Sequence, residues 1–229
     1  MGTRRARVRR ILRRILLYAA LLVALYGGTC FGALLLLKWV EPPFTMVHVQ
    51  RRVESWFGKR KYRKQYSFVP LSRISPHLRH AVIAAEDGRF YQHAGVDWAE
   101  IEKMIETEMP EGRIRGVSTI TQQLVKNLFM TTHRNPLRKP VEFALAPLAE
   151  ILLGKQRILE LYLNIVEWGP GVYGAEAAAR RYYQTSAAAL SRERAARLAA
   201  VLPSPLRWKP ERMDRYAAVI EQRMAGQGW

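Results

Sequence analysis

A run of twenty-three uncharged, mostly apolar residues near the amino terminus constrains the fold more than any other feature of this chain. Residues 15–37 contain no Asp, Glu, Lys or Arg, and about twenty such residues suffice for a helix to cross the hydrocarbon core of a bilayer. Seven arginines lie within the first fourteen residues, and basic residues beside a span favour the cytoplasmic side. The sequence therefore predicts a cytoplasmic tail at residues 1–14, a membrane-spanning helix at 15–37, and the remaining chain outside the cytoplasm.

A cleaved signal peptide and a lipid anchor at Cys30 are the other interpretations of this segment. The apolar run is longer than the central region of a signal peptide and lacks a small-x-small motif at its end. Strongly apolar sequence continues after Cys30, which is the only cysteine, and a single thiol excludes an intramolecular disulfide. A second basic cluster, at residues 59–64, opposes the predicted topology, but the arginines closer to the span should dominate.

The formal net charge of +18 is by itself typical of nucleic-acid-binding proteins. The predicted location outside the cytoplasm argues against a nucleic-acid partner. A membrane-bound basic module that only binds anionic ligands is the non-enzymatic alternative.

Residues 38–65 are predicted to form a juxtamembrane amphipathic segment. Val49, Val53, Trp56 and Phe57 recur at helical spacing with polar residues between them. This pattern suits a short helix at the membrane surface. An ordinary helix that faces the protein core is the alternative.

Residues 66–229 are predicted to form one all-α or mainly α-helical domain, because no run of alternating strand residues stands out. A domain of this size can bury a core without disulfides. Capping residues and apolar spacing predict helices at 76–85, 97–107, from Ser118 onward, and at 139–153, 155–165, 174–183 and 191–201.

The first dense polar block is EDGRFYQHAG at residues 86–95. Glu86 and Asp87 directly follow the apolar stretch AVIAA. The two acids are therefore expected to lie in a polar pocket or in solvent, at the end of a buried segment. A carboxylate in a partly apolar cleft has a raised pKa and can act as a general base near neutral pH. Solvated acids at a helix end are the alternative. His93 has no partner at zinc-ligand spacing, so it could orient an acid or a backbone group of the loop. Asp87 and His93 are both predicted to bind substrate.

A second polar block, GVSTITQQLVKN, follows at residues 116–127. Its hydroxyls and amides surround a predicted helix start, where free N–H groups favour an anionic or sugar-like ligand. Solvated side chains beside a simple cap are the alternative. The binding candidates in this block are Ser118, Thr119, Gln122, Gln123, Lys126 and Asn127.

A third group combines Arg134, Arg138 and Lys139 with Glu142. Arginine and lysine side chains both bind diphosphates well. Arg138 and Glu142 are four residues apart, so an ordinary ion pair within a helix is an equally good interpretation. Pro147 falls in the middle of the same predicted helix and predicts a kink there.

Five blocks in order resemble the signatures of the peptidoglycan glycosyltransferases, the polymerase module that also forms the amino-terminal half of bifunctional penicillin-binding proteins. They are EDGRFYQHAG, GVSTITQQLVKN, RKPVEFALAPLAE, KQRILELYLN and the stretch 193–205. The resemblance covers about residues 66–208. Because nothing large follows residue 208, the chain is expected to resemble the monofunctional branch of the family.

The resemblance implies a lysozyme-like domain with a cleft between two lobes, and lipid II as the substrate. Glu86 would take the proton from the GlcNAc 4-hydroxyl of lipid II as this attacks the growing chain's terminal MurNAc, with inversion at the anomeric carbon. Glu142 would be the second catalytic residue and would orient either the cations that hold the departing diphosphate or a divalent ion. Those cations would be Lys126, Arg134, Arg138 and Lys139.

The resemblance implies no obligatory cofactor, and Mg²⁺ or Mn²⁺ would come bound to the substrate diphosphate. The implied partners are lipid II, the growing lipid-linked glycan chain, the membrane, and proteins of cell wall synthesis or division. The implied location is the bacterial inner membrane, with a periplasmic catalytic domain. A lytic enzyme that cleaves finished glycan is the main competing function, but glycan cleavage has no diphosphate for the cationic group to stabilise.

Overall fold

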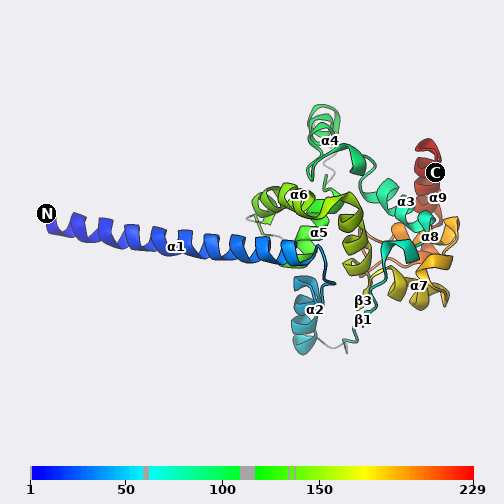
Figure 1. Cartoon of the computed structure of the whole chain (residues 1–229), viewed down its shortest axis with the longest axis horizontal. Coiled ribbons are helices and arrows are strands. Elements are labelled where there is room, and N and C mark those ends of the chain that lie inside the picture. Colours follow the sequence, from blue (N-terminus) through cyan, green and yellow to red (C-terminus); the bar gives the residue numbers. More distant parts are fainter. Residues whose placement is uncertain (1, 59–61, 109–116, 134, 137) are drawn as a thin grey trace. The chain divides into compact units, whose positions relative to one another are not determined.

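The computed structural model describes residues 2–58, 62–108, 117–133, 135–136 and 138–229 (Figure 1). The chain forms two compact units, Met1–Val40 and Glu41–Trp229. The first unit consists mainly of one helix, and the second contains the other helices and strands of the described residues.

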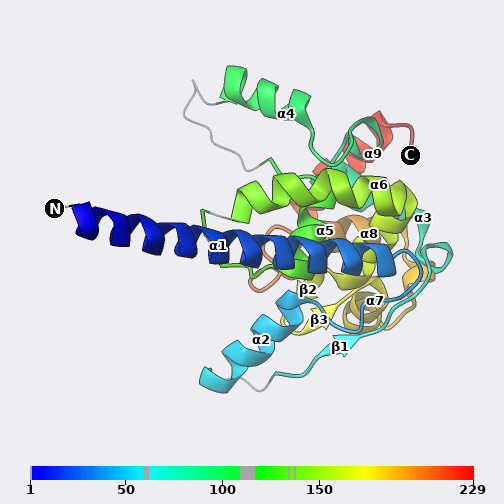
Figure 2. The same cartoon turned by 60° about the vertical axis from the view of Figure 1, so that its left-hand side comes forward.

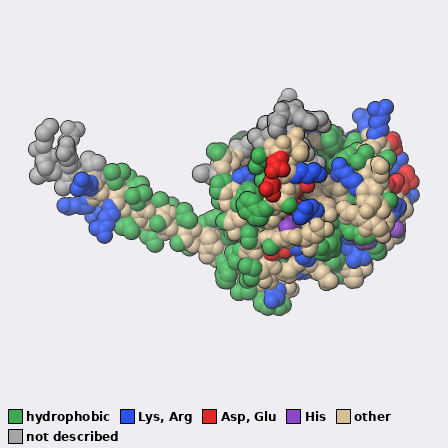
Figure 3. All heavy atoms as spheres, turned by 90° about the horizontal axis from the view of Figure 1, so that it is seen from above, with side chains coloured by type: hydrophobic (Ala, Val, Ile, Leu, Met, Phe, Trp, Pro, Cys, Tyr) green, Lys and Arg blue, Asp and Glu red, His purple; other side chains and the backbone are tan. Residues whose placement is uncertain are grey.

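Helix α1 runs from Gly2 to Leu36 without interruption, so the arginine-rich tail continues the helix. Within it, Arg9–Leu36 is a stretch of 28 residues that is long and apolar enough to cross a membrane. At about 1.5 Å per residue this stretch is roughly 42 Å long, more than the roughly 30 Å of a hydrocarbon core. Figure 3 shows hydrophobic side chains along most of α1 and basic ones near its amino end. The helix is therefore suited to anchor the chain as a single membrane span.

The second unit is mainly helical, which confirms the predicted fold class. Helix α5 packs most extensively against α6, and α3, α8 and α9 pack against one another. Helix α4 and the π-helix η3 project from the rest (Figures 1 and 2). Among the described residues, the α-helices and the π-helix are α2 (Met46–Phe57), α3 (Pro76–Glu86), α4 (Trp98–Lys103), η3 (Met104–Glu108), α5 (Ile120–Phe129), α6 (Arg138–Ile165), α7 (Ala175–Tyr183), α8 (Arg192–Ala199) and α9 (Asp214–Gly226). Short 3-10 helices are η1 (Leu71–Arg73), η2 (Phe90–Gln92), η4 (Ala187–Ala189) and η5 (Pro210–Arg212).

Three short strands, which the sequence pattern did not predict, form one sheet in the order β1-β3-β2. They are β1 (Gln65–Tyr66), β2 (Glu167–Gly169) and β3 (Val172–Tyr173). β1 runs parallel to β3, and β2 runs antiparallel to it. Two or three residues are too few to produce a visible alternation of apolar and polar side chains, which explains why they were missed.

Several helix boundaries differ from the predicted ones. The residue that caps α5 is Thr119, one position after the predicted Ser118. Its Oγ1 accepts from Gln122 N–H at 3.1 Å, and Gln122 Oε1 accepts from Thr119 N–H at 3.1 Å. In α6, Pro147 keeps helical backbone angles, and the interruption lies at Gly154, whose φ is 73°. Glycine reaches positive φ without the strain that a side chain would cause.

Helix α2 exposes its predicted apolar stripe. Val49 and Val53 are exposed, as are Trp56 (71%) and Phe57 (88%), whereas Val47 is buried. The structure therefore contradicts the alternative in which this stripe faces the protein core.

Candidate active site

A cleft of about 650 Å³ lies beside the carboxyl end of α3. One wall comes from residues 84–89, at the carboxyl end of α3 and just beyond it, and a second comes from the start of α5. The third wall is α9, which contributes Tyr216 and Arg223, with Gln227 just beyond it. The sequence pattern did not predict α9 or its part in this cleft.

Glu86 is the last residue of α3 and lines this cleft. Gln123 Nε2 donates a hydrogen bond to Glu86 Oε2 at 2.7 Å. Burial raises the pKa of the Glu86 carboxyl, the hydrogen bond from Gln123 and the charge of Lys126 lower it, and Asp87 raises it further. A carboxylate with a raised pKa is a stronger base than a solvated one, so Glu86 is suited to accept a proton.

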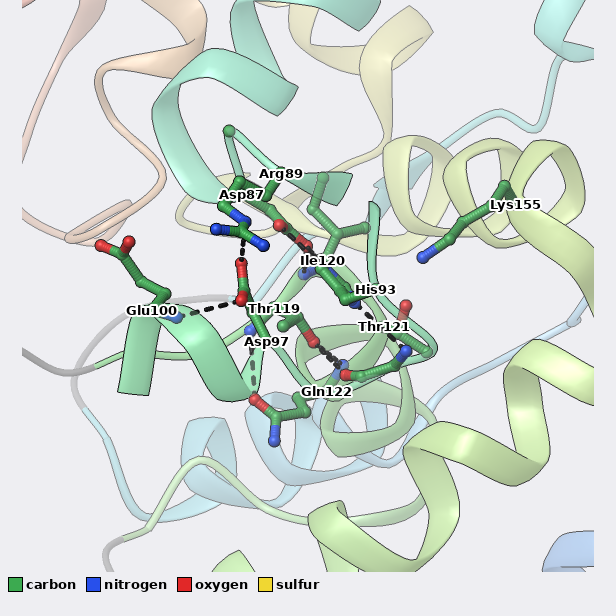
Figure 4. Close-up of polar contacts among 12 residues, drawn as sticks. Asp87, Arg89, His93, Asp97, Glu100, Thr119, Ile120, Thr121, Gln122 and Lys155 are labelled. Atoms are coloured by element: carbon green, nitrogen blue, oxygen red, sulfur yellow. Dashed lines mark hydrogen bonds and ion pairs between the residues drawn. The ribbon is translucent and has the colours of Figure 1, made fainter. Parts of the chain in front are cut away.

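Asp87 and His93 interact with protein groups and with each other (Figure 4). Their side chains are 3% and 5% exposed. His93 Nε2 lies 3.0 Å from Asp87 Oδ1, and Ile120 N–H donates to Asp87 Oδ2 at 2.9 Å. Gly95 N–H donates to His93 Nδ1 at 3.2 Å, which leaves the ring proton on Nε2. These contacts favour a positioning role for both residues over the predicted contact with substrate.

Asp97 lies close to this pair, so that Asp87, His93 and Asp97 have possible metal-ligand atoms within 4.8 Å of one another. Spacing along the sequence did not predict this grouping. Asp97 accepts from Glu100 N–H at 3.0 Å and forms an ion pair of 3.3 Å with Arg89. Because the His93 proton faces Asp87, the donor set fits a hydrogen-bonded cluster better than a cation site.

The amino end of α5 is held in place by its own polar residues. Thr119 and Gln122 are 3% and 2% exposed and form the capping box, and Thr119 Oγ1 also donates to Gly95 O at 2.6 Å. Asn127 is 7% exposed. Gln122 is thus turned toward protein partners and does not line the cleft. Thr119 lines the cleft together with Ser118, Gln123 and Lys126, but its hydroxyl is bonded to protein groups.

A buried carboxylate organises the cationic group. Glu142 is 2% exposed; its Oε1 lies 2.9 Å from Arg138 Nε and its Oε2 lies 3.1 Å from Lys139 Nζ. Lys139 Nζ also donates to Ser118 Oγ at 2.7 Å. The ion pair of Arg138 and Glu142 within one helix, considered from the sequence, is therefore present. The predicted Arg134 lies outside the described residues.

Lys126 links the carboxylate Glu86 to this cationic group. Burial lowers the pKa of its ammonium group, the nearby Glu142 and Glu86 raise it, and Arg138 and Lys139 lower it. Lys126 therefore lies within electrostatic reach of both carboxylates. A base and a set of cations next to one cleft can accept a proton at one point and stabilise a departing anion at another.

Comparisons with known proteins identify the family to which this chain belongs. Residues 52–226 match the family model described as Transglycosylase. A protein named "Biosynthetic peptidoglycan transglycosylase" from Pseudomonas entomophila (strain L48) is 44% identical over 211 residues, which cover 92% of this chain and 86% of that protein. Proteins of the same name from Pseudomonas fluorescens (strain SBW25) and Pseudomonas syringae pv. syringae (strain B728a) are 48% identical over 198 residues and 43% over 221. These two matches cover 85% and 95% of this chain, and 82% and 90% of the respective relatives.

The family match and the names of the relatives define a glycosyl-transferring class of enzyme, and a helical fold with a cleft lined by Glu86 and Lys126 is compatible with that class. The family match covers most of the chain, and the relatives are aligned over most of their own length. The chain belongs to the transglycosylase family.

Proposed function

We propose that this chain polymerises the glycan strands of peptidoglycan from lipid II. The observation that carries the proposal is that Glu86, Lys126 and Ser118 line one cleft, and that Ser118 accepts a hydrogen bond from Lys139, which is ion-paired with Glu142. A base for a sugar hydroxyl and a binding site for a diphosphate leaving group are thereby close together. The names of the relatives, which refer to peptidoglycan biosynthesis, support the same substrate class.

In the proposed reaction, Glu86 takes the proton from the GlcNAc 4-hydroxyl of lipid II. The oxygen then forms a bond to the anomeric carbon of the MurNAc at the end of the growing chain. The bond from that carbon to the diphosphate oxygen breaks at the same time, and the lipid diphosphate leaves with the bonding electrons. Attack from the opposite face converts the α-linked phosphate into a β-1,4 linkage without a covalent enzyme intermediate.

The cationic group stabilises the leaving diphosphate. Lys126, Arg138 and Lys139 provide three positive charges against the single charge of Glu142, so the group keeps an excess of positive charge. Glu142 acts by orienting Arg138 and Lys139, which flank its carboxylate. Since both carboxylate oxygens already face cations, Mg²⁺ or Mn²⁺ in this proposal is bound by the substrate diphosphate and its water molecules.

The proposed location is the bacterial inner membrane, with the amino terminus in the cytoplasm and residues 41–229 in the periplasm. The exposed apolar stripe of α2 supports contact of this unit with the membrane surface, where a lipid-linked substrate is confined. Proteins of cell wall synthesis or division are the proposed partners.

The full-length Glu86→Gln variant, in detergent and supplied with labelled lipid II, tests the function. Wild type should build lipid-linked polymer that can be separated by size, and the variant should lose at least about a hundredfold in rate because the amide cannot accept the proton. Glu102→Gln, an equivalent change at an exposed position of α4, should polymerise normally. Circular dichroism checks that both variants fold.

Two results would reject the proposal. Near-normal polymerisation by Glu86→Gln would exclude this residue as the base. Cleavage of purified glycan strands by wild type, with lipid II left intact, would favour a lytic enzyme.

A further inference from the structure

A buried tyrosine connects α6 to Glu86 through Gln123. Tyr162 is fully buried in the core of the domain. Its hydroxyl donates to Gln123 Oε1 at 2.9 Å, and Gln123 Nε2 donates to Glu86 Oε2 at 2.7 Å. Tyr162 belongs to the buried face of α6, together with Ile158, Leu161 and Ile165. A buried tyrosine nevertheless needs a hydrogen-bond partner for its hydroxyl, and here that partner is a residue of the cleft.

The contact with Tyr162 favours one orientation of the Gln123 carboxamide. A carboxamide has an acceptor end and a donor end. With the Tyr162 O–H directed at Oε1, the amino group faces Glu86. The reversed amide would place Gln123 Oε1 against Oε2 of the Glu86 carboxylate, and two acceptors repel each other. Burial, with the charges of Glu86 and Asp87, raises the pKa of Tyr162 well above its usual value, so its hydroxyl keeps its proton.

We propose that Tyr162 is a positioning residue for the base: it holds Gln123 so that the amide donates to Oε2 of Glu86 and leaves Oε1 to take the substrate proton. This inference rests on the proposed role of Glu86. It adds a residue on α6 whose side chain does not line the cleft.

The charges around Glu86 fix the sign of the expected pH effect. Burial raises the pKa of Glu86, Gln123 and Lys126 from α5 lower it, and Asp87 raises it; the Tyr162 hydroxyl, from α6, is neutral. Loss of the Gln123 hydrogen bond removes one of the two lowering influences, so the pKa of Glu86 rises. A base is active when deprotonated, so activity in the variant appears only at higher pH.

The test is Tyr162→Phe in the full-length protein, with kcat and KM for lipid II measured across pH. We expect kcat to fall about tenfold, KM to change little, and the acid limb of the kcat profile to move to higher pH. Tyr173→Phe is the matched control, because Tyr173 is also fully buried and its hydroxyl lies 3.3 Å from that of Tyr62, outside the cleft. Its pH profile should equal that of wild type.

A double-mutant cycle separates this role from simple packing. The relay is the chain of hydrogen bonds from Tyr162 through Gln123 to Glu86. Gln123→Met removes the acceptor and the donor of its middle residue at similar side-chain length, and it should shift the acid limb in the same direction. Adding Tyr162→Phe to Gln123→Met should cause little further loss, because residues that act through one another are not additive. Additive losses, or an unshifted acid limb in a folded Tyr162→Phe variant, would overturn the proposal. If Tyr162→Phe does not fold, the acid limb of Gln123→Met is compared with that of wild type, and an unshifted limb would overturn the proposal.

A titration that needs no substrate distinguishes failure of the relay from failure of the proposed function. In protein labelled with ¹³C at glutamate carboxyl groups, the Glu86 signal is the one absent from Glu86→Gln. Its midpoint should lie at higher pH in Tyr162→Phe than in wild type, and an equal midpoint would refute the relay. If wild type does not act on lipid II but the midpoint moves, the relay stands and the polymerase assignment fails.

Discussion

Gly95 is in very close contact with another part of the chain. Its φ is +91°, and a Cβ there would lie 2.7 Å from Ala146 C and 2.8 Å from Ala146 O. Its N–H donates to His93 and its O accepts from Thr119. The glycine therefore allows the loop after Glu86 to pack directly on α6 while it joins the ring of His93 to the start of α5.

Gly95→Ala is expected to destabilise the protein by about 3 kcal/mol or more, because it combines backbone strain with overpacking against α6. Gly226→Ala is the matched control. A Cβ at Gly226, the last residue of α9, meets nothing within 4 Å, and alanine favours a helix by up to about 1 kcal/mol over glycine. Midpoints of urea unfolding for both variants measure the difference. Equal midpoints would show that the loop can move away from α6.

For individual residues, the sequence predicted which side chains belong to the site better than it predicted the role of each one. Glu86 was recognisable because two acids directly follow a buried apolar stretch. Whether Asp87, His93 or Gln122 faces a ligand or the protein depends on partners such as Ile120, up to 33 residues away. No local pattern contains that information, so these side chains were predicted to bind substrate.

Helix α2 contacts the region of the cationic group, although it precedes all five sequence blocks. Gln50 Oε1 accepts from Thr132 N–H at 2.7 Å, and its Nε2 donates to Thr132 Oγ1 at 2.9 Å. Arg138 Nη1 in turn donates to Thr132 O at 3.4 Å. Gln50 is 7% exposed. The amide thus fixes the segment from which Arg138 begins α6.

Gln50→Leu should therefore raise KM for lipid II about fivefold with a smaller effect on kcat, because the loss of these hydrogen bonds loosens the diphosphate-binding segment. Ser55→Ala is the control on the same helix, since Ser55 Oγ donates within its own turn, to Arg52 O. Steady-state kinetics of both variants provide the test. An unchanged KM in Gln50→Leu would show that α2 does not support the cationic group.

Most of the helices could be predicted from caps and apolar spacing, including α3 from Pro76 and the two parts of α6. Helix α9 was missed even though Ala217, Ile220 and Met224 form its buried face. A small residue and a flexible one produce a weak apolar stripe, so the 3.6-residue period is hard to see there. The short sheet depends on pairing between distant segments, which periodicity cannot reveal.

At the scale of the whole molecule, two basic clusters favour opposite topologies. The first fourteen residues contain seven arginines next to the span, and residues 59–64 contain five further basic residues beyond it. Only charges close to a span strongly influence its orientation. The second cluster starts more than twenty residues after the apolar run, so the arginines should hold the amino end in the cytoplasm.

Cysteine labelling tests this topology, because Cys30 is the only native cysteine. In a Cys30→Ser background, Arg212→Cys introduces a thiol at an exposed position of the second unit, and Thr3→Cys introduces one in the amino-terminal tail. A membrane-impermeant maleimide added to intact spheroplasts should label Arg212→Cys and leave Thr3→Cys unlabelled until the membrane is broken. The reverse pattern would place the cleft in the cytoplasm. The proposed transfer onto a growing strand outside the membrane would then be impossible, whatever the chemistry of Glu86.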